Sequence, residues 1–267
     1  MKHRHFVFTI LFILLAGYLH AQQTKNQRDA QGRKQGYWEA VDKKGFPVYT
    51  GYFKDDKPVG EMKRYHPEGG GIRVIMQYSQ DGEKAYSRFY GLNGKLAAEG
   101  NYVQTKRDSI WTFYNYHTGN LSYKTGYRMG MRQGKSQAFY PGGSVAEEVS
   151  WNNDLKDGPW KQYFESGQLK LSATYKKDML EGSFLLYFPD GKKQTDGKYL
   201  NGRPDGNWLR YNENGSVAIT IKYKNGIIAN YDELTEAQQE IFKKMEETKI
   251  KEPTIEEMMR EAQKANR

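Results

Sequence analysis

The sequence predicts an all-β protein: an extended, twisted antiparallel meander of about eight 24-residue β-hairpin repeats, with a short α-helical cap at the C-terminal end. Three observations support this prediction. A Gly-x-Trp-x-x-Tyr pattern recurs about every 24 residues, apolar and polar residues alternate in several segments, and glycine-containing turns separate those segments. A short, fixed period is typical of stacked repeats that rely on their neighbours for stability.

The pattern is clearest in the second half of the chain. Its three best copies are Gly158–Trp160–Tyr163, Gly182–Phe184–Tyr187 and Gly206–Trp208–Tyr211. An earlier copy has Ser109 at the glycine position and keeps Trp111 and Tyr114. Steps of 24 or 25 residues give the starting positions of the other units, at Gly134, Ala85, Gly60 and Gly36. We therefore assign the repeat domain to residues 35–231.

Each unit has the same internal order. A strand such as 160–164 is followed by a turn such as Asp190-Gly191 or Asn214-Gly215, which suits the positive φ angles of tight hairpins. The second strand alternates with a period of two, and a second turn such as 201–206 leads to the next unit. This assigns the recurring glycines to turns. At ~4.8 Å per strand, about 16 strands would form a sheet on the order of 75 Å long.

The aromatic positions form two columns, one of Trp or Phe and one of Tyr three residues later. Positions three apart in a strand point to opposite faces, so we expect one column in the core and the other on the outer face or at a strand end. A purely structural role is one interpretation. An exposed aromatic ladder for sugar rings or an extended peptide is the other.

Units one to three and unit five depart from the pattern. They have Val41 in place of Tyr, and Met62, Ser87 and Ser136 in place of Trp. Departures of this kind indicate either capping of the array or a surface altered for binding. We favour capping for unit one only.

The two ends of the chain differ from the repeats. Residues 1–21 combine a basic start, an apolar run over Phe6–Leu15 and a cleavage site at Ala21, which predicts a secretory signal peptide; an uncleaved anchor is the alternative. Residues 22–34 are assigned to a short linker. Export places the protein in the periplasm, at the cell surface or outside the cell, and the absence of cysteine argues against a lipoprotein anchor.

Residues 232–267 form the predicted helical tail. Thr235 and Gln238 make a capping box for a helix over about 236–250, and Thr254 and Glu257 make another for a second short helix. These helices either cover the exposed last strand of the sheet or bind a partner. We favour the first interpretation.

The formal net charge is +9, and the excess of basic residues lies in the repeats because the tail is acidic. Such a surface suits an anionic lipid or glycan, although solvated lysines on exposed strand faces are the simpler interpretation. Nucleic acid is not expected as a partner of an exported protein.

No residues point to catalysis, a cofactor or a metal. His66 and His117 have no second ligand at a metal spacing, and no nucleophile elbow or phosphate loop is present. Acidic residues recur just before the repeat glycine position, at Asp108, Asp157, Glu181 and Asp205. We expect them to accept hydrogen bonds from turn amides rather than to bind calcium.

The unit Asp157-Gly158-Pro159-Trp160-Lys161-Gln162-Tyr163, with Gly167 and Tyr175, resembles the MORN-repeat variant. So does Asp205–Tyr211 with Asn214-Gly215 and Tyr223. Bacterial proteins of this type are grouped as the YwqK family and are often labelled antitoxins. The resemblance implies an all-β meander that binds a partner without catalysis.

We therefore expect an exported, non-catalytic scaffold for an unidentified protein partner, with an antitoxin-like role as one form of that function. The alternative is a module that binds glycans or anionic membrane surfaces. The sequence does not indicate which sheet face would bind.

Overall fold

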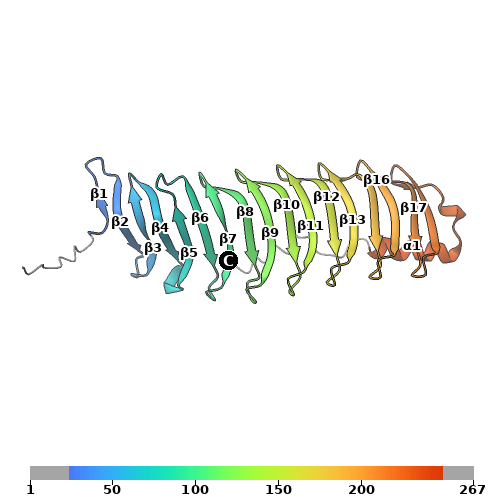
Figure 1. Ribbon diagram of the computed structural model, residues 1–267, viewed down its shortest axis with the longest axis horizontal. Helices are drawn as coiled ribbons and strands as arrows, with labels where there is room; N and C mark the ends of the chain where they lie inside the picture. The colour runs from blue at the N-terminus through green and yellow to red at the C-terminus, as the bar shows by residue number, and fades with distance from the viewer. Residues whose placement is uncertain (1–23, 249–267) are drawn as a thin grey trace, which may run out of the picture.

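A computed structural model describes residues 24–248 and shows one long antiparallel sheet (Figure 1). Over these residues the chain forms 19 strands, which pair in sequence order except that β14 and β15 both pair with β13. The first ten are β1 (Gln27–Arg28), β2 (Lys34–Val41), β3 (Pro47–Lys54), β4 (Lys57–Tyr65), β5 (Ile72–Tyr78), β6 (Lys84–Tyr90), β7 (Leu96–Val103), β8 (Lys106–Tyr114), β9 (Leu121–Arg128) and β10 (Met131–Phe139). The predicted all-β meander is confirmed.

The array continues in the same way to its C-terminal end. Its remaining strands are β11 (Val145–Asn152), β12 (Leu155–Tyr163), β13 (Leu169–Lys176), β14 (Met179–Leu180), β15 (Gly182–Tyr187), β16 (Lys193–Leu200), β17 (Arg203–Tyr211), β18 (Val217–Lys224) and β19 (Ile227–Ile228). Both β14 and β15 pair with β13, so they are one strand interrupted at Glu181. Short 3₁₀ segments occur at Pro67–Gly69 and Tyr231–Glu233.

Turns lie along two long edges of the sheet. The lower edge in Figure 1 carries the predicted glycine turns, where Gly167, Gly191 and Gly215 have φ of 84 to 89°. Asp190 and Asn214 accept hydrogen bonds from backbone N–H groups two residues later. The predicted glycines therefore have the expected positive φ, but each turn is a five-residue connection in which Asp190 or Asn214 serves as a side-chain acceptor and does not itself have positive φ.

The upper edge corrects the prediction of a six-residue second turn. The connection between β16 and β17 is only Asn201-Gly202, and both residues have positive φ, as in six other two-residue turns of this edge; β5 and β6 are joined by five residues. Strand β17 then begins at Arg203, so the repeat glycine Gly206 lies inside a strand.

That glycine marks a β-bulge. Lys198 pairs with Asp205 and Asp196 pairs with Leu209, so extra residues on β17 bulge out around Gly206, whose φ is 72°. The same shift surrounds Gly158. The assignment of the repeat glycines to turns was wrong, because both settings need positive φ and the sequence alone does not distinguish them. Between β5 and β6 the register is continuous, and Ala85 takes the glycine position there.

Both end strands of the sheet are covered. At the first, the Asn26 side chain donates to the Glu39 carbonyl and accepts from the Glu39 N–H, as a neighbouring strand would. At the last, Asn230 accepts from Lys222 N–H and donates to the Thr220 carbonyl. These side-chain amides form hydrogen bonds with backbone groups of β2 and β18 that could otherwise pair with an additional strand.

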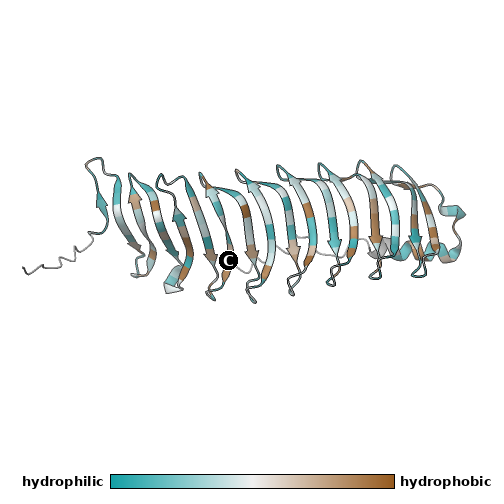
Figure 2. Cartoon of the chain, viewed as in Figure 1, coloured by the Kyte–Doolittle hydropathy of each residue, from teal (hydrophilic) through white to brown (hydrophobic). Residues whose placement is uncertain are grey.

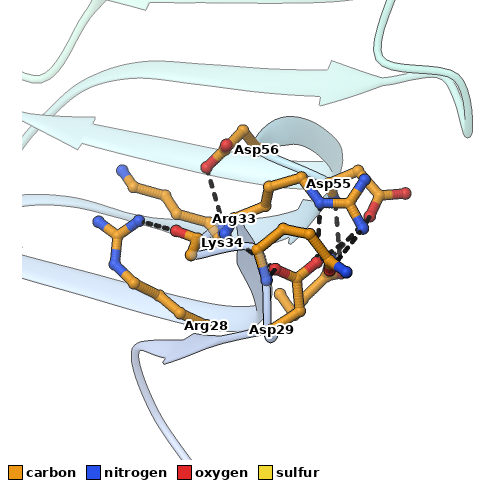
Figure 3. Close-up of polar contacts among 9 residues, drawn as sticks. Arg28, Asp29, Arg33, Lys34, Asp55 and Asp56 are labelled. Atoms are coloured by element: carbon orange, nitrogen blue, oxygen red, sulfur yellow. Dashed lines mark hydrogen bonds and ion pairs between the residues drawn. The ribbon is translucent and has the colours of Figure 1, made fainter.

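Ion pairs hold the first turn of the upper edge against the next one (Figure 3). Arg33 contacts Asp29 at 2.8 Å and Asp55 at 3.0 Å, and Asp56 accepts from the Lys34 N–H at 2.8 Å. Residues within 22–34, assigned to a linker, therefore take part in the sheet through β1 and this network.

Helix α1 (Glu236–Thr248) closes the C-terminal end. It begins with the predicted capping box, in which Gln238 N–H donates to Thr235 Oγ1 and Thr235 N–H donates to Gln238 Oε1. Leu234, Ile241 and Phe242 pack against the cluster of Trp208, Ile219 and Ile221. The helix therefore covers the sheet face at the last hairpins, and the edge itself is covered by β19 and Asn230. The predicted signal peptide and second tail helix lie outside the described residues.

Candidate binding surfaces

One face of the sheet, called the aromatic face, carries the Trp and Phe column. Cross-strand pairs connect this column from strand to strand, and Figure 2 shows hydrophobic residues recurring along the array. Trp111 is fully buried and Trp208 is 6% exposed. Side chains of neighbouring strands cover both indoles, and Trp208 is also covered by the C-terminal segment through Leu234, Ile241 and Phe242.

Glycine makes room for both indoles. A Cβ at Gly100 would lie 2.5 Å from the Trp111 ring, and one at Gly197 would clash with Trp208. Trp111 Nε1 donates to the Asn101 carbonyl at 2.9 Å and Trp208 Nε1 donates to the Lys198 carbonyl at 3.1 Å. Each indole therefore lies across a glycine of the preceding strand and satisfies its N–H on the next backbone carbonyl.

Trp160 has a different environment. Val149 pairs with it where the other indoles meet glycine, and Trp160 is only half-buried. Its indole N–H donates to the Glu147 carboxylate, and its ring centroid lies 5.3 Å from that of Tyr175. Phe184 is also half-buried and packs against Tyr199 and Trp208.

The Tyr column points to the opposite face, called the tyrosine face. Tyr114 donates to Glu99 Oε1 at 2.6 Å, and Tyr86, from the degraded third unit, donates to Glu99 Oε2 at 2.7 Å. Burial and these hydrogen bonds to a carboxylate raise the pKa of each phenol to about 12. Hydrogen bonds from Tyr114 and Tyr86 in turn lower the pKa of Glu99. Tyr163 makes a similar bond to Glu148, and Tyr187 and Tyr211 are half-buried.

Basic side chains lie over the rings of the aromatic face. The Arg107 guanidinium is 4.6 Å from the centroid of Trp111, and Lys34 Nζ is 4.8 Å from that of Trp38. Lys156 lies over Tyr175 at 5.3 Å, and Arg132 lies over Trp151 at 3.6 Å. These positions recur four residues before the Trp position, a spacing that was visible in the sequence. The basic side chains place positive charge on the aromatic face. Its two most buried indoles, Trp111 and Trp208, are not accessible to a ligand.

The upper edge carries an apolar row that was not recognised from the sequence. Met131, Leu155, Met179 and Ile227 each follow a two-residue turn and are 42 to 72% exposed. Met131, Leu155 and Met179 are 24 residues apart. Ile227 follows Met179 by 48 residues, because Arg203 occupies the equivalent position between them. The signal was therefore present, but the Gly-x-Trp-x-x-Tyr pattern does not include this position.

The acidic residues before the repeat glycine position have mixed roles. Asp108 accepts from the Met129 N–H and Glu181 accepts from the Asn201 N–H, both in the following turn. Asp205 pairs with Lys198 at 3.5 Å. Within residues 24–248, no group of three or more His, Asp or Glu side chains could hold a metal ion. His66 contacts the Tyr90 carbonyl through Nε2, and His117 is exposed.

Three of the four departures from the pattern are buried, and the fourth, Val41 in unit one, is 55% exposed. Ser87, at a Trp position, is fully buried, and its hydroxyl has no hydrogen-bond partner among the described residues. Ser136 is also fully buried and bonds to Thr125 across the strand pair. Met62 is 4% exposed. Smaller side chains at these positions are therefore packed into the aromatic face.

Three of the repeats match the MORN repeat variant. The matched segments are residues 132–153, 156–177 and 204–225. Each matched segment begins at the second residue of a strand, β10, β12 or β17, directly after an upper-edge turn. It ends at the first residue of the next upper-edge turn. One repeat is therefore a complete hairpin with its lower-edge turn in the middle.

Other comparisons add little to the MORN repeat match. No curated protein matches the chain. Among solved structures, the crystal structure of TarM is similar over 39% of this chain and 21% of that chain, with 14% identity and a TM-score of 0.27. No functional conclusion rests on this likeness. In the part of the chain that the structure describes, no helix has the length and apolar character needed to span a membrane.

Proposed function

We propose that the protein is a non-catalytic repeat scaffold that binds a protein partner. The observation that supports this proposal is the row of exposed apolar side chains on the upper edge, at equivalent positions of successive hairpins. Exposed apolar side chains that recur in a line are typical of interaction sites. The covered end strands favour contact through this row over contact through strand addition.

The test is saturable capture. The purified protein is immobilised and titrated with fractionated envelope extract, and bound proteins are quantified. We expect at least one protein to saturate and to be displaced by free scaffold, which nonspecific adsorption would not show. Absence of any saturable protein would contradict the proposal.

We further propose that the protein acts after export, because residues 1–21 have the form of a signal peptide. N-terminal sequencing of the mature protein from the native host should start at Gln22. An intact Met1 on protein recovered from the cytoplasm would contradict export. An antitoxin-like role, implied by the resemblance to YwqK-type proteins, would make the captured partner a toxin in the same compartment.

The second candidate function is binding of an anionic glycan or lipid surface. It is favoured by Arg107, Lys34 and Lys156, which lie on the aromatic face and have no carboxylate partner among the described residues. Co-sedimentation with peptidoglycan, or with vesicles containing an anionic phospholipid, should then occur at low salt and weaken at high salt. Absence of binding at low salt would eliminate this candidate.

A further inference from the structure

The hairpin tips of the upper edge share a pattern that the repeat motif does not contain. At six successive tips, the last residue before the turn pairs with the first residue after it, and one is apolar while the other is polar. The pairs are Val103 with Lys106, Arg128 with Met131, Asn152 with Leu155, Lys176 with Met179, Leu200 with Arg203, and Lys224 with Ile227. Five of the six polar partners are basic.

These pairs form a line because successive turns are joined by backbone hydrogen bonds. The Asp154 N–H donates to the Arg132 carbonyl at 3.1 Å, and the Asp178 N–H donates to the Lys156 carbonyl at 2.8 Å. The Gly202 and Gly226 N–H groups donate in the same way to Leu180 and Pro204. Equivalent side chains therefore recur every two strands, or about 9.6 Å.

The apolar members stay exposed within this line. Met131 is 44% exposed, Leu155 42%, Met179 47% and Ile227 72%, and Leu200, on the other strand of its pair, is 46% exposed. Lys156 lies over a ring of the aromatic face, so its neighbour Leu155 points to the tyrosine face. The line therefore lies at the rim of the tyrosine face, away from helix α1.

The basic members also remain available. Arg128, Lys176, Arg203 and Lys224 are exposed, and none of them makes an ion pair within residues 24–248. The nearby carboxylates of Asp154 and Asp178 accept hydrogen bonds from the N–H groups of Arg132 and Lys156 in the preceding turn. These two carboxylates offset part of the positive charge, but basic side chains outnumber them along the apolar row, which therefore keeps a net positive charge.

We propose that this tip row binds an acidic amphipathic α-helix of a protein partner; this inference rests on the proposed function. A helix advances about 10.5 Å in seven residues, close to the ~9.6 Å spacing of the tips, so apolar residues one heptad apart face successive tips. A partner strand does not fit, because its same-face residues recur at ~6.6 or ~13 Å. Methionine-rich surfaces accept such helices readily, and acidic flanking residues match the basic members of the tips.

The test uses the full-length protein and a labelled peptide of four heptads with leucine on one face and glutamate on the flanks. We expect saturable binding by fluorescence anisotropy that weakens at high salt. A matched peptide with lysine in place of glutamate should bind at least about tenfold more weakly. A peptide of the same composition with a central proline should also lose binding, because the helix is interrupted.

The variant Leu155→Glu/Met179→Glu should reduce the affinity for the acidic peptide at least about tenfold. The matched control is Leu92→Glu/Val217→Glu, which adds the same charge at apolar side chains of 67 and 51% exposure on the lower edge. The control should bind within about twofold of the unmodified protein. Circular dichroism and thermal unfolding verify that both variants remain folded.

Equal binding by the tip and control variants, equal binding of the proline peptide, or no binding of the acidic peptide would each overturn this inference. The same two variants are then applied to any partner captured from envelope extract. A partner that binds saturably but ignores the tip substitutions would leave the proposed function standing and remove the tip row as its site. No saturable partner would count against the proposed function itself.

Discussion

At the scale of single residues, the pairing of glycine with tryptophan accounts for the best-packed parts of the aromatic face. Gly100 and Gly197 have ordinary φ angles, so their backbone conformation does not require glycine. What requires glycine is the indole that lies across each of them. The sequence predicted Trp111 and Trp208 as repeat positions, but it did not reveal that a glycine eleven residues earlier completes each site.

We expect Gly100→Ala and Gly197→Ala to destabilise the protein by about 1–3 kcal/mol each, because the added methyl group overpacks the indole. Urea unfolding monitored by tryptophan fluorescence measures the change. Gly142→Ala is the control, since its Cβ would meet only Glu165 Oε1 at 3.7 Å and its φ is also ordinary. Equal stability of all three variants would show that the indoles can move without cost.

The tyrosine face predicts a dependence on alkaline pH. The pKa values of Tyr86 and Tyr114 are raised from 10.0 to about 12 in the folded protein, so their contribution to stability is complete below pH 10 and is lost as the pH rises through about 12. The free energy of unfolding, measured from pH 9 to 12, should decrease across this window. Glu99→Gln should flatten the decrease, because the carboxylate that opposes phenolate formation is removed.

Glu165→Gln is the control for this experiment, because Glu165 is exposed and its hydrogen bond within residues 24–248 is accepted by its backbone carbonyl, from the Ser144 hydroxyl. It should leave the pH profile unchanged. If Glu99→Gln and Glu165→Gln give the same profile as the unmodified protein, the alkaline transition arises from other groups.

At the scale of elements, the hairpins were predictable and their bulges were not. The period-two segments correctly placed strands such as β13 and β18, and the capping box correctly placed the start of α1. The repeat glycine was misplaced because positive φ is common to turns and bulges, and hydrogen-bond register is not visible in a sequence. Asn26 and Asn230 lie outside the regular pattern, so the repeat could not predict that their side chains bond to the end strands.

The end strands supply a prediction at this scale. Asn230→Asp keeps the shape of the side chain and its bond from Lys222 N–H, but an ionised carboxylate cannot donate to the Thr220 carbonyl. We expect a loss of about 1–3 kcal/mol at neutral pH, because Asn230 is only 6% exposed and a buried acceptor loses its donor. Thermal unfolding measures this loss, and light scattering measures any self-association through the uncovered edge.

Asn212→Asp is the matched control, because Asn212 is exposed and water can replace its bond to Ser216. The loss in Asn230→Asp should diminish at acidic pH, where a protonated carboxyl can donate again. A stability equal to that of the control at neutral pH would mean that the amide is not needed to cover the edge.

At the scale of the whole molecule, the array is close to one-dimensional, because each hairpin pairs only with those beside it. The sequence predicted this architecture, since the period alone implies it. The sequence did not reveal the proposed binding surface, because the tip row depends on which residues face each other across each turn.

Deletion of residues 158–181 removes one full period and joins Asp157 to Gly182, which preserves the phase of the repeat. We expect a folded protein that is shorter by about 10 Å in small-angle scattering, with a smaller dependence of unfolding on urea concentration. Deletion of residues 158–169 removes half a period and should prevent folding, because it reverses strand direction downstream. A folded product from both deletions would contradict a strictly stacked array.

The two covered end strands have a consequence for how such a protein can change over time. The side-chain amide of Asn26 hydrogen-bonds to β2, and that of Asn230 hydrogen-bonds to β18. The number of hairpins between them is therefore independent of how the sheet is terminated. Duplication or loss of an internal hairpin would alter the length of the tip row, and so the length of the partner helix proposed to bind it, while both terminations stay intact.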